Sequence, residues 1–221
     1  MANSWVSAEK AADYLARADR LPHRADGERV LVRDLSGALP GRVLDLGCGD
    51  GRLSALVLAA YPQSVATLVD LSPPMLAAAA KRFDRDDRVT LTTHDLGDEL
   101  PFDEPFDAVI SSLAIHHVSN ERKRALYGEI ARLLAPGGVF GNLEIVASPT
   151  QALHDQWREE MGARDDPSDV LCDMATQLSW IGEAGLDNVD CIWKWRSLAL
   201  MRGERLNPAS DPPRSSRPDG G

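Results

Sequence analysis

Residues 43–53, VLDLGCGDGRL, join a short apolar run to a stretch with helical character through three closely spaced glycines. The run ends just before Gly47, and Gly49 and Gly51 follow at alternate positions. Glycine adopts backbone conformations that other residues avoid, and it lets a ligand approach the main chain. A strand that turns through such a loop into a helix places bare backbone at the carboxyl end of a sheet, where open α/β sheets bind ligands. The stretch therefore predicts an α/β domain with a ligand site at this loop.

The chain around this loop alternates short β-branched or apolar runs with helical stretches. The predicted strands are residues 42–46, 65–70, 88–95, 106–112 and 138–146, and the predicted helices between them are residues 51–60, 73–84 and 120–134. Pro136-Gly137-Gly138 is expected to end the last of these helices, because proline cannot continue a helix and glycine accepts a positive φ. Such alternation requires right-handed crossovers and a parallel sheet covered on both faces. The predicted fold class is a doubly wound α/β domain.

The segments on either side of this core follow a different pattern. Amphipathic periodicity predicts helices at residues 7–19, 25–38, 150–164 and 168–184. Two strands with almost no linker at residues 187–203 predict an antiparallel hairpin, and residues 204–221, rich in Pro, Ser and Gly, are predicted to be disordered. We expect a single domain over residues 1–203, with an N-terminal helical cap at 1–38, a ligand-binding core at 42–146, a helical insertion at 147–184 and the closing hairpin at 187–203.

Composition excludes several classes of function. The formal net charge of −10 disfavours binding to nucleic acid, which needs a basic face to neutralise phosphates. Cys48, Cys172 and Cys191 form no CxxC pair, so we expect neither a metal site nor a disulfide framework. The start of the chain does not have the pattern of a signal peptide, and no window reaches the roughly 18 apolar residues of a membrane span. We expect a cytoplasmic protein, monomeric or homodimeric, without a membrane partner.

Two aspartates follow the second and third predicted strands. Asp70 ends VATLVD, where a carboxylate can accept hydrogen bonds from both hydroxyls of a ribose; it can equally cap the helix that begins with Ser72-Pro73-Pro74. Asp95 lies in THDL, where a carboxylate can accept the exocyclic amine of an adenine ring; it can equally be an ordinary loop residue. Leu96 offers either a side chain for the ring face or a backbone N–H for a ring nitrogen. Together with the glycine loop, these residues favour an adenosine-containing ligand.

These motifs together resemble those of class I S-adenosylmethionine (SAM) dependent methyltransferases. Five occur in the expected order within residues 42–146: VLDLGCGDG, LVD, HDL, FDAVISSLAIHHV and LLAPGGVF. The resemblance implies SAM as cofactor and a seven-stranded, mostly parallel sheet whose last strand is reversed within 187–203. It implies that Asp45 orients the glycine turn or takes the amino group of the ligand, and that Gly47 and Gly49 let the backbone approach the methionyl part. The other expected cofactor-binding residues are Cys48, as a small filler, Asp50, Asp70, Leu71, Asp95, Leu96 and Ser111.

Two histidines follow the fourth predicted strand, where the transferred methyl group would point. A methyl group on a sulfonium is already activated, so transfer needs mainly an acceptor held in line. A hydroxyl or ammonium acceptor must also lose a proton, and His116 and His117 are the candidate bases, with His117 preferred. Histidines at this place also serve packing and hydrogen bonding in the family. Ser111 can line the ligand pocket or cap the end of the strand.

The acceptor site is expected to come from residues 1–38 and 147–184. Two short helical additions favour transfer to an O, N or C atom of a small organic molecule. Arg24 can reach the methionyl carboxylate, although a plain surface role is the simpler expectation. A loose resemblance to the wobble-uridine tRNA-modifying branch, and a non-catalytic SAM-binding module, are alternatives. A nicotinamide dehydrogenase is disfavoured, because Arg52 replaces the third glycine of its fingerprint and Asp95 has no role in it.

Overall fold

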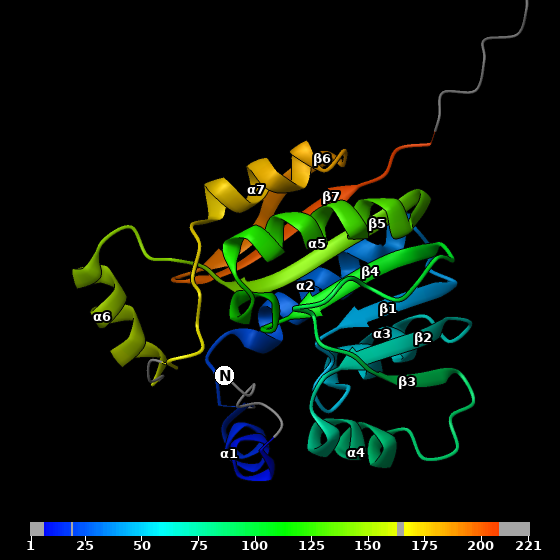
Figure 1. Cartoon of the computed structure of the whole chain (residues 1–221), viewed down its shortest axis with the longest axis horizontal. Coiled ribbons are helices and arrows are strands. Elements are labelled where there is room, and N and C mark those ends of the chain that lie inside the picture. Colours follow the sequence, from blue (N-terminus) through cyan, green and yellow to red (C-terminus); the bar gives the residue numbers. More distant parts are fainter. Residues whose placement is uncertain (1–6, 19, 163–165, 208–221) are drawn as a thin grey trace, which may run out of the picture.

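The computed structural model describes residues 7–18, 20–162 and 166–207, which contain a seven-stranded sheet in the spatial order β3-β2-β1-β4-β5-β7-β6 (Figure 1). The strands are β1 Arg42–Leu46, β2 Val65–Asp70, β3 Val89–Thr93, β4 Phe106–Ser112, β5 Leu134–Ile145, β6 Asp187–Trp195 and β7 Leu198–Glu204. Strands β1 to β5 pair in parallel, and β7 is antiparallel to both β5 and β6. The predicted doubly wound α/β fold with a reversed last strand is confirmed.

Helices cover both faces of this sheet (Figure 1). One face carries α2 Arg24–Asp34, α3 Arg52–Ala60 and α4 Pro73–Arg82, and the other carries α5 Asn120–Leu133 and α7 Met174–Glu183. Helices α1 Ala8–Ala18 and α6 Gln151–Met161 lie at one side of the sheet, and short 3-10 turns occupy Leu35–Gly37 and Ile115–His117. No helix among the described residues is long and apolar enough to cross a bilayer.

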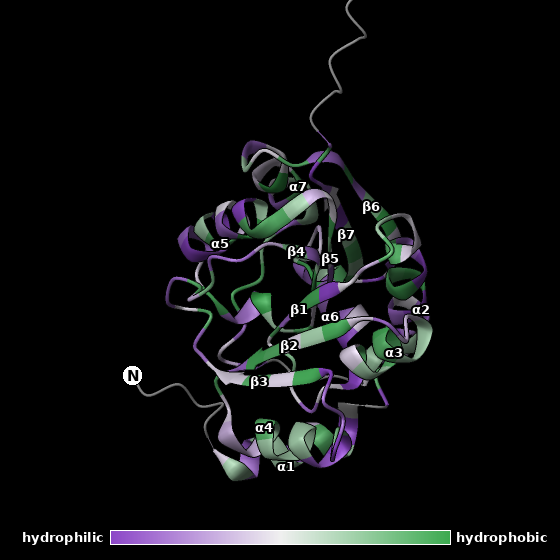
Figure 2. Cartoon of the chain, turned by 90° about the vertical axis from the view of Figure 1, so that its right-hand side faces the viewer, coloured by the Kyte–Doolittle hydropathy of each residue, from purple (hydrophilic) through white to green (hydrophobic). Residues whose placement is uncertain are grey.

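Alternating side chains of the central strands supply two cores, one on each face. Val43 packs with residues of α2 and α3, whereas its neighbour Leu44 packs with residues of α5. Both side chains are completely buried, and each contributes roughly 1.5–3 kcal/mol to folding. Figure 2 shows hydrophobic residues concentrated on the strands and hydrophilic residues on the outer faces of the helices. This two-sided burial explains why the strands are apolar runs.

The strand order reverses at the centre of the sheet. From β1 the chain moves outward to β2 and β3, and it then returns to β4 on the opposite side of β1. Loops that leave β1 and β4 therefore diverge at their carboxyl ends, and such a switch point opens a crevice for ligands. The glycine loop follows β1 directly, so the fold places it at this crevice.

The structure corrects two boundaries around the fifth strand. Strand β5 begins at Leu134, which pairs with Phe106, and not at residue 138. Pro136-Gly137-Gly138 lies inside the strand, where its register to β4 shifts. Arg205 holds this irregular stretch, because its backbone N–H donates to Gly138 O at 2.9 Å and its carbonyl accepts from Gly137 N at 2.6 Å. The predicted disorder from residue 204 is therefore wrong for 204–205, and residues 208–221 lie outside the described part of the chain.

The helix predicted at residues 168–184 begins only at Met174. Asp173 caps it by accepting a hydrogen bond from the N–H of Thr176 at 2.9 Å. The preceding segment is not helical and runs beside other parts of the chain, with Val170 N donating to His116 O at 2.8 Å and Ala147 N donating to Cys172 O at 3.0 Å. Strand β3 is likewise shorter than its predicted span, and the ends of the helices predicted at 7–19 and 150–164 fall outside the described residues.

Candidate cofactor and acceptor site

A cavity of about 760 Å³ lies at the carboxyl ends of β1, β2 and β4. Most residues predicted from sequence to bind the cofactor line it, namely Gly47, Cys48, Gly49, Asp50, Asp70, Leu71, Asp95 and Leu96. Tyr14 of α1, Arg24 of α2 and Ser168 of the segment before α7 are among the other residues that line it. The volume is within the range of about 300–1,000 Å³ typical of small-molecule sites.

The glycine loop has a left-handed backbone at all three glycines, with φ of 67° at Gly47, 55° at Gly49 and 76° at Gly51. A Cβ atom at Gly47 would lie 2.2 Å from Cβ of Ala114, so this glycine allows the loop to pack against the chain after β4. A Cβ atom at Gly49 would meet nothing within 4 Å. Gly47 therefore serves packing, and Gly49 leaves open space beside the cavity.

Asp70 fastens the glycine loop to the end of β2. Its two carboxylate oxygens accept hydrogen bonds of 2.8 Å, one from Gly49 N and the other from Ser72 N. Burial raises the pKa of Asp70, and these backbone donors act in the opposite direction. Asp70 also lines the cavity, and its contact with a ligand stays a prediction. Its hydrogen bond to Ser72 N fixes the residue before α4 rather than an N–H of the helix itself.

Asp45 lies behind the loop and does not line the cavity. Its side chain is buried and accepts a 2.6 Å hydrogen bond from Ser54 Oγ. Burial, with the nearby charge of Asp70, raises the pKa of Asp45 to about 7 against the hydrogen bond from Ser54. Its position fits the first of its two predicted roles, orientation of the glycine turn.

Ser111 also lies away from the cavity, contrary to its prediction as a cofactor-binding residue. Its hydroxyl is fully buried and donates to Leu46 O at 2.8 Å, so it links β4 to β1. Its neighbour Ser112 lines the cavity, because successive side chains of a strand point to opposite faces.

Three further predicted residues have partners at the rim of the cavity. Asp95 Oδ1 accepts from Gly97 N at 2.8 Å, which holds the loop after β3 in a tight turn. Asp50 forms an ion pair with Arg82 of α4. Cys48 Sγ contacts Gly49 O at 3.5 Å, and burial together with the carboxylates of Asp45 and Asp70 raises its pKa.

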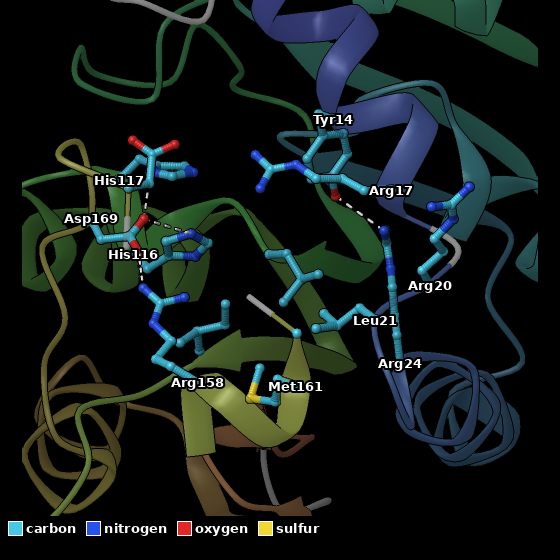
Figure 3. A pocket seen from close by; sticks show the side chains of 14 residues that line it. Tyr14, Arg17, Arg20, Leu21, Arg24, His116, His117, Arg158, Met161 and Asp169 are labelled. Carbon is cyan, nitrogen blue, oxygen red and sulfur yellow. Dashed lines mark hydrogen bonds and ion pairs between the residues drawn. The ribbon is translucent and has the colours of Figure 1, made fainter. Parts of the chain in front are cut away.

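A second cavity, of about 260 Å³, adjoins the first and shares Tyr14, Arg24, Leu113 and His117 with it (Figure 3). Its other charged or titratable lining residues are Arg17, Arg20, His116, Arg158, Asp166 and Asp169, and its apolar ones are Leu21, Ile145 and Met161. These residues come from α1, the link between α1 and α2, α2, the turn after β4, the end of β5, α6 and the segment before α7. The helical additions and the core therefore line this cavity together, and its role as the acceptor site stays a prediction.

Arg24 is buried in the wall between the two cavities, so the expected surface role is wrong. Its guanidinium donates to Glu28 Oε1 at 2.8 Å and to the Tyr14 hydroxyl at 3.0 Å. The Glu28 carboxylate is fully buried and also pairs with Arg52 at 2.8 Å. This group joins α2 to the start of α3 and to α1.

The two predicted catalytic histidines have different environments. His116 is buried between two carboxylates, with Nδ1 bonded to Glu144 and Nε2 3.5 Å from Asp169 Oδ1. Burial opposes its positive charge, but Glu144 and Asp169 outweigh burial and raise the pKa of His116. His117 lines both cavities, and burial with the charge of His116 lowers its pKa to about 3.

Arg158 and Asp169 belong to the site but were not predicted from the sequence. Arg158 of α6 donates to Asp169 Oδ2 at 2.9 Å, and Asp169 faces both histidines at 3.5 Å. The two histidines and Asp169 bring three potential metal-ligand atoms within 4.8 Å of one another. Because Arg158 and Glu144 already pair with this group, protein charges balance it and we assign no metal to it.

Residues 43–138 match the family described as "Methyltransferase domain". The chain carries a class I SAM-dependent methyltransferase domain. Trans-aconitate 2-methyltransferase of Methylobacterium nodulans is 36% identical over 128 residues, which cover 58% of this chain and 46% of that protein. The enzyme of the same name from Acidovorax ebreus is 32% identical over 144 residues, or 63% of this chain and 53% of that protein. The chain thus spans about half the length of these relatives.

The fold of this methyltransferase domain also matches solved structures. An O-methyltransferase family protein from Burkholderia thailandensis superposes with a TM-score of 0.67 and 25% identity, over 81% of this chain and 56% of that one. The sequence motifs predict that SAM binds at the glycine loop after the first strand. In this chain that loop is the wall of the larger cavity, and the smaller cavity lies beside it.

Proposed function

We propose that this protein transfers the methyl group of SAM to a small organic molecule. The observation that carries the proposal is the pair of adjoining cavities, which share four lining residues. The larger cavity has the size and the residues for an adenosyl ligand, and the smaller one gives an acceptor a place next to it. A module that only bound SAM would not require the second cavity.

The residues of the larger cavity suit the parts of SAM. We assign the ribose hydroxyls to Asp70, the adenine amine to Asp95 and the methionyl part to the backbone at Gly47 and Gly49. Asp70 is a carboxylate that faces the cavity although it is mostly buried, and Gly49 leaves room for close approach to the main chain. Asp50, Asp70 and Asp95 line this cavity, and their carboxylates favour a cationic adenosyl compound over a pyrophosphate.

The protein contributes mainly position to this reaction. When bound, SAM supplies a methyl group that is already activated on a sulfonium. Holding two reactants in line can lower the barrier by roughly 7–11 kcal/mol, which requires few special groups. Leu113, shared by the two cavities, and Met161 of α6 wall off water beside the acceptor. His117 lines both cavities, and its role as a base stays a prediction.

A small acceptor agrees with the size of the second cavity, about 260 Å³. The matched relatives from Methylobacterium nodulans and Acidovorax ebreus are named trans-aconitate 2-methyltransferases, and trans-aconitate is a small molecule. A tRNA acceptor is disfavoured, because the net charge of −10 would repel phosphates.

Equilibrium binding tests the cofactor assignment. SAM, its product S-adenosylhomocysteine and NADH are titrated by calorimetry into the wild-type protein and the variant Asp70→Ala. Asp84→Ala is the control, because the side chain of Asp84 is exposed. We expect micromolar binding of SAM and its product, no binding of NADH, and at least a tenfold loss, about 1.4 kcal/mol, for Asp70→Ala only. Binding of NADH alone, or of neither ligand, would contradict the proposal. Turnover of SAM with an acceptor then separates an enzyme from a binding module.

A further inference from the structure

We propose that the methyl acceptor is a small organic acid, with Arg17 as the residue that binds it and a carboxylate oxygen as the atom that takes the methyl group. This inference rests on the proposed function. It concerns the smaller cavity, whose lining residues carry an unusual charge for this protein. The net charge of the chain is −10, yet four arginines line this one cavity, Arg17, Arg20, Arg24 and Arg158.

Most charges around the cavity are already matched within the protein. Arg24 pairs with Glu28, Arg158 with Asp169, and Lys10 with Asp166 at 3.0 Å. Among the described residues, the side chains of Arg17 and Arg20 form no hydrogen bond or ion pair. The excess positive charge of the cavity therefore lies on these two arginines.

Arg17 is the arginine placed to meet a ligand. Figure 3 shows its side chain extending from α1 over the cavity toward the side where His116 and His117 lie, whereas the guanidinium of Arg20 points away. A planar guanidinium binds a carboxylate through two parallel hydrogen bonds. Apolar side chains of Leu21, Leu113 and Met161 line the same cavity and suit the hydrocarbon part of an acid.

The histidines support a carboxylate acceptor, because neither is suited to remove a proton. Both ring nitrogens of His116 face carboxylates, which favour its protonated form and leave neither nitrogen open to an acceptor. His117 has a pKa of about 3, so it is a poor general base for a hydroxyl or an ammonium group. A carboxylate is ionised at neutral pH and needs no base.

The transfer is balanced without a proton acceptor. A lone pair of the carboxylate oxygen forms the new bond to the methyl carbon, while the bond from that carbon to sulfur breaks and its electron pair stays on sulfur. The sulfonium charge and the carboxylate charge disappear together. The products are a methyl ester and S-adenosylhomocysteine, and no proton is released.

The binding test uses the full chain saturated with S-adenosylhomocysteine. Succinate, citrate and benzoate are titrated by calorimetry, with succinamide and benzamide as neutral counterparts. The control for Arg17→Gln is Arg33→Gln, because Arg33 of α2 is also exposed and lines neither cavity. We expect at least one acid to bind, its amide not to bind, and Arg17→Gln alone to lose affinity tenfold or more. Absence of binding by all three acids up to 10 mM, or equal binding by Arg17→Gln, would overturn the inference.

The product test uses SAM with a radiolabelled methyl group and the acid that binds. A methyl ester releases its label as methanol in mild alkali, and its formation releases no proton to a weakly buffered solution. An alkali-stable label, or one proton released for each S-adenosylhomocysteine formed, would overturn the inference and leave the methyltransferase proposal intact. Failure of SAM to bind would overturn the proposed function itself, so the two failures are distinguishable.

Discussion

Gly47 and Gly49 lie two residues apart in the cofactor loop but have different surroundings. Both have left-handed backbones, which cost a residue with a side chain roughly 1–2 kcal/mol. At Gly47 a Cβ atom would also clash with Ala114. We expect Gly49→Ala to lower the free energy of unfolding by about 1 kcal/mol and Gly47→Ala by at least about 3 kcal/mol.

Urea denaturation of the two alanine variants measures this difference, and each serves as the control for the other. Because the Cβ of Gly49→Ala would occupy space at the wall of the SAM cavity, this variant should remain folded and yet bind SAM at least tenfold more weakly. Equal losses of stability in the two variants would contradict the assignment of Gly47 to packing.

Asp45 should make the stability of the ligand-free protein depend on pH. The pKa of Asp45 is raised from 3.8 to about 7 on folding, so between these values the folded protein keeps a proton that the unfolded chain loses. Stability from this group is complete below pH 4 and falls as pH rises toward 7, by up to about 4 kcal/mol. We expect Asp45→Asn to remove this slope, so that the variant gains stability relative to wild type at pH 8.

Urea denaturation at pH 5 and pH 8 tests this prediction, with Asp84→Asn as an exposed control that keeps the slope of the wild-type protein. The comparison between variants cancels the contributions of other titrating groups. If Asp45→Asn retained the wild-type slope, burial of this carboxyl in its protonated form would be wrong.

At the scale of elements, one buried carboxylate fastens α1, α2 and α3 together. Glu28 is fully buried between Arg24 and Arg52, and Arg24 in turn donates to Tyr14. Removing one partner from a buried ion pair leaves uncompensated charge and costs roughly 3–5 kcal/mol. We expect Glu28→Gln to lower the free energy of unfolding by about 3 kcal/mol in urea denaturation.

Glu99→Gln is the matched control, because Glu99 is exposed and lies 3.6 Å from Arg132 at the surface. Its substitution should change stability by less than about 1 kcal/mol. Similar small losses for both variants would show that α2 and α3 are held by apolar packing alone.

The local sequence pattern predicted the strands and the crossover helices, because apolar residues recur along each of them with the spacing typical of a strand or a helix. It could not predict the segment before α7, where Lys10 binds Asp166 and Ser168 across more than 150 positions of sequence. Pattern also missed the burial of Arg24, which depends on Glu28 and Tyr14 from two helices. The glycine loop and its aspartates could be predicted from the sequence, because each lies at or directly after the end of a predicted strand. Arg158 and Asp169 meet only in the folded chain.

At the scale of the whole molecule, both cores share one sheet, so the chain should unfold in a single transition. A ligand that binds only the folded state stabilises it by about 2.7 kcal/mol at 100 times its Kd. For a protein of this size we expect S-adenosylhomocysteine at that concentration to raise Tm by roughly 5–11 °C. Thermal scans with NADH as control test this. Two separate transitions, of which only one responded to the ligand, would contradict the prediction of a single domain.

The environment of the Cys48 thiol also bears on whether SAM could methylate this residue. SAM is an alkylating agent, and a thiolate, unlike a thiol, is a strong nucleophile toward such compounds. Cys48 lines the cofactor cavity, and burial with the carboxylates around it keeps its sulfur protonated. In the proposed complex, burial and the carboxylates of Asp45 and Asp70 would thus also protect the Cys48 sulfur from methylation by SAM.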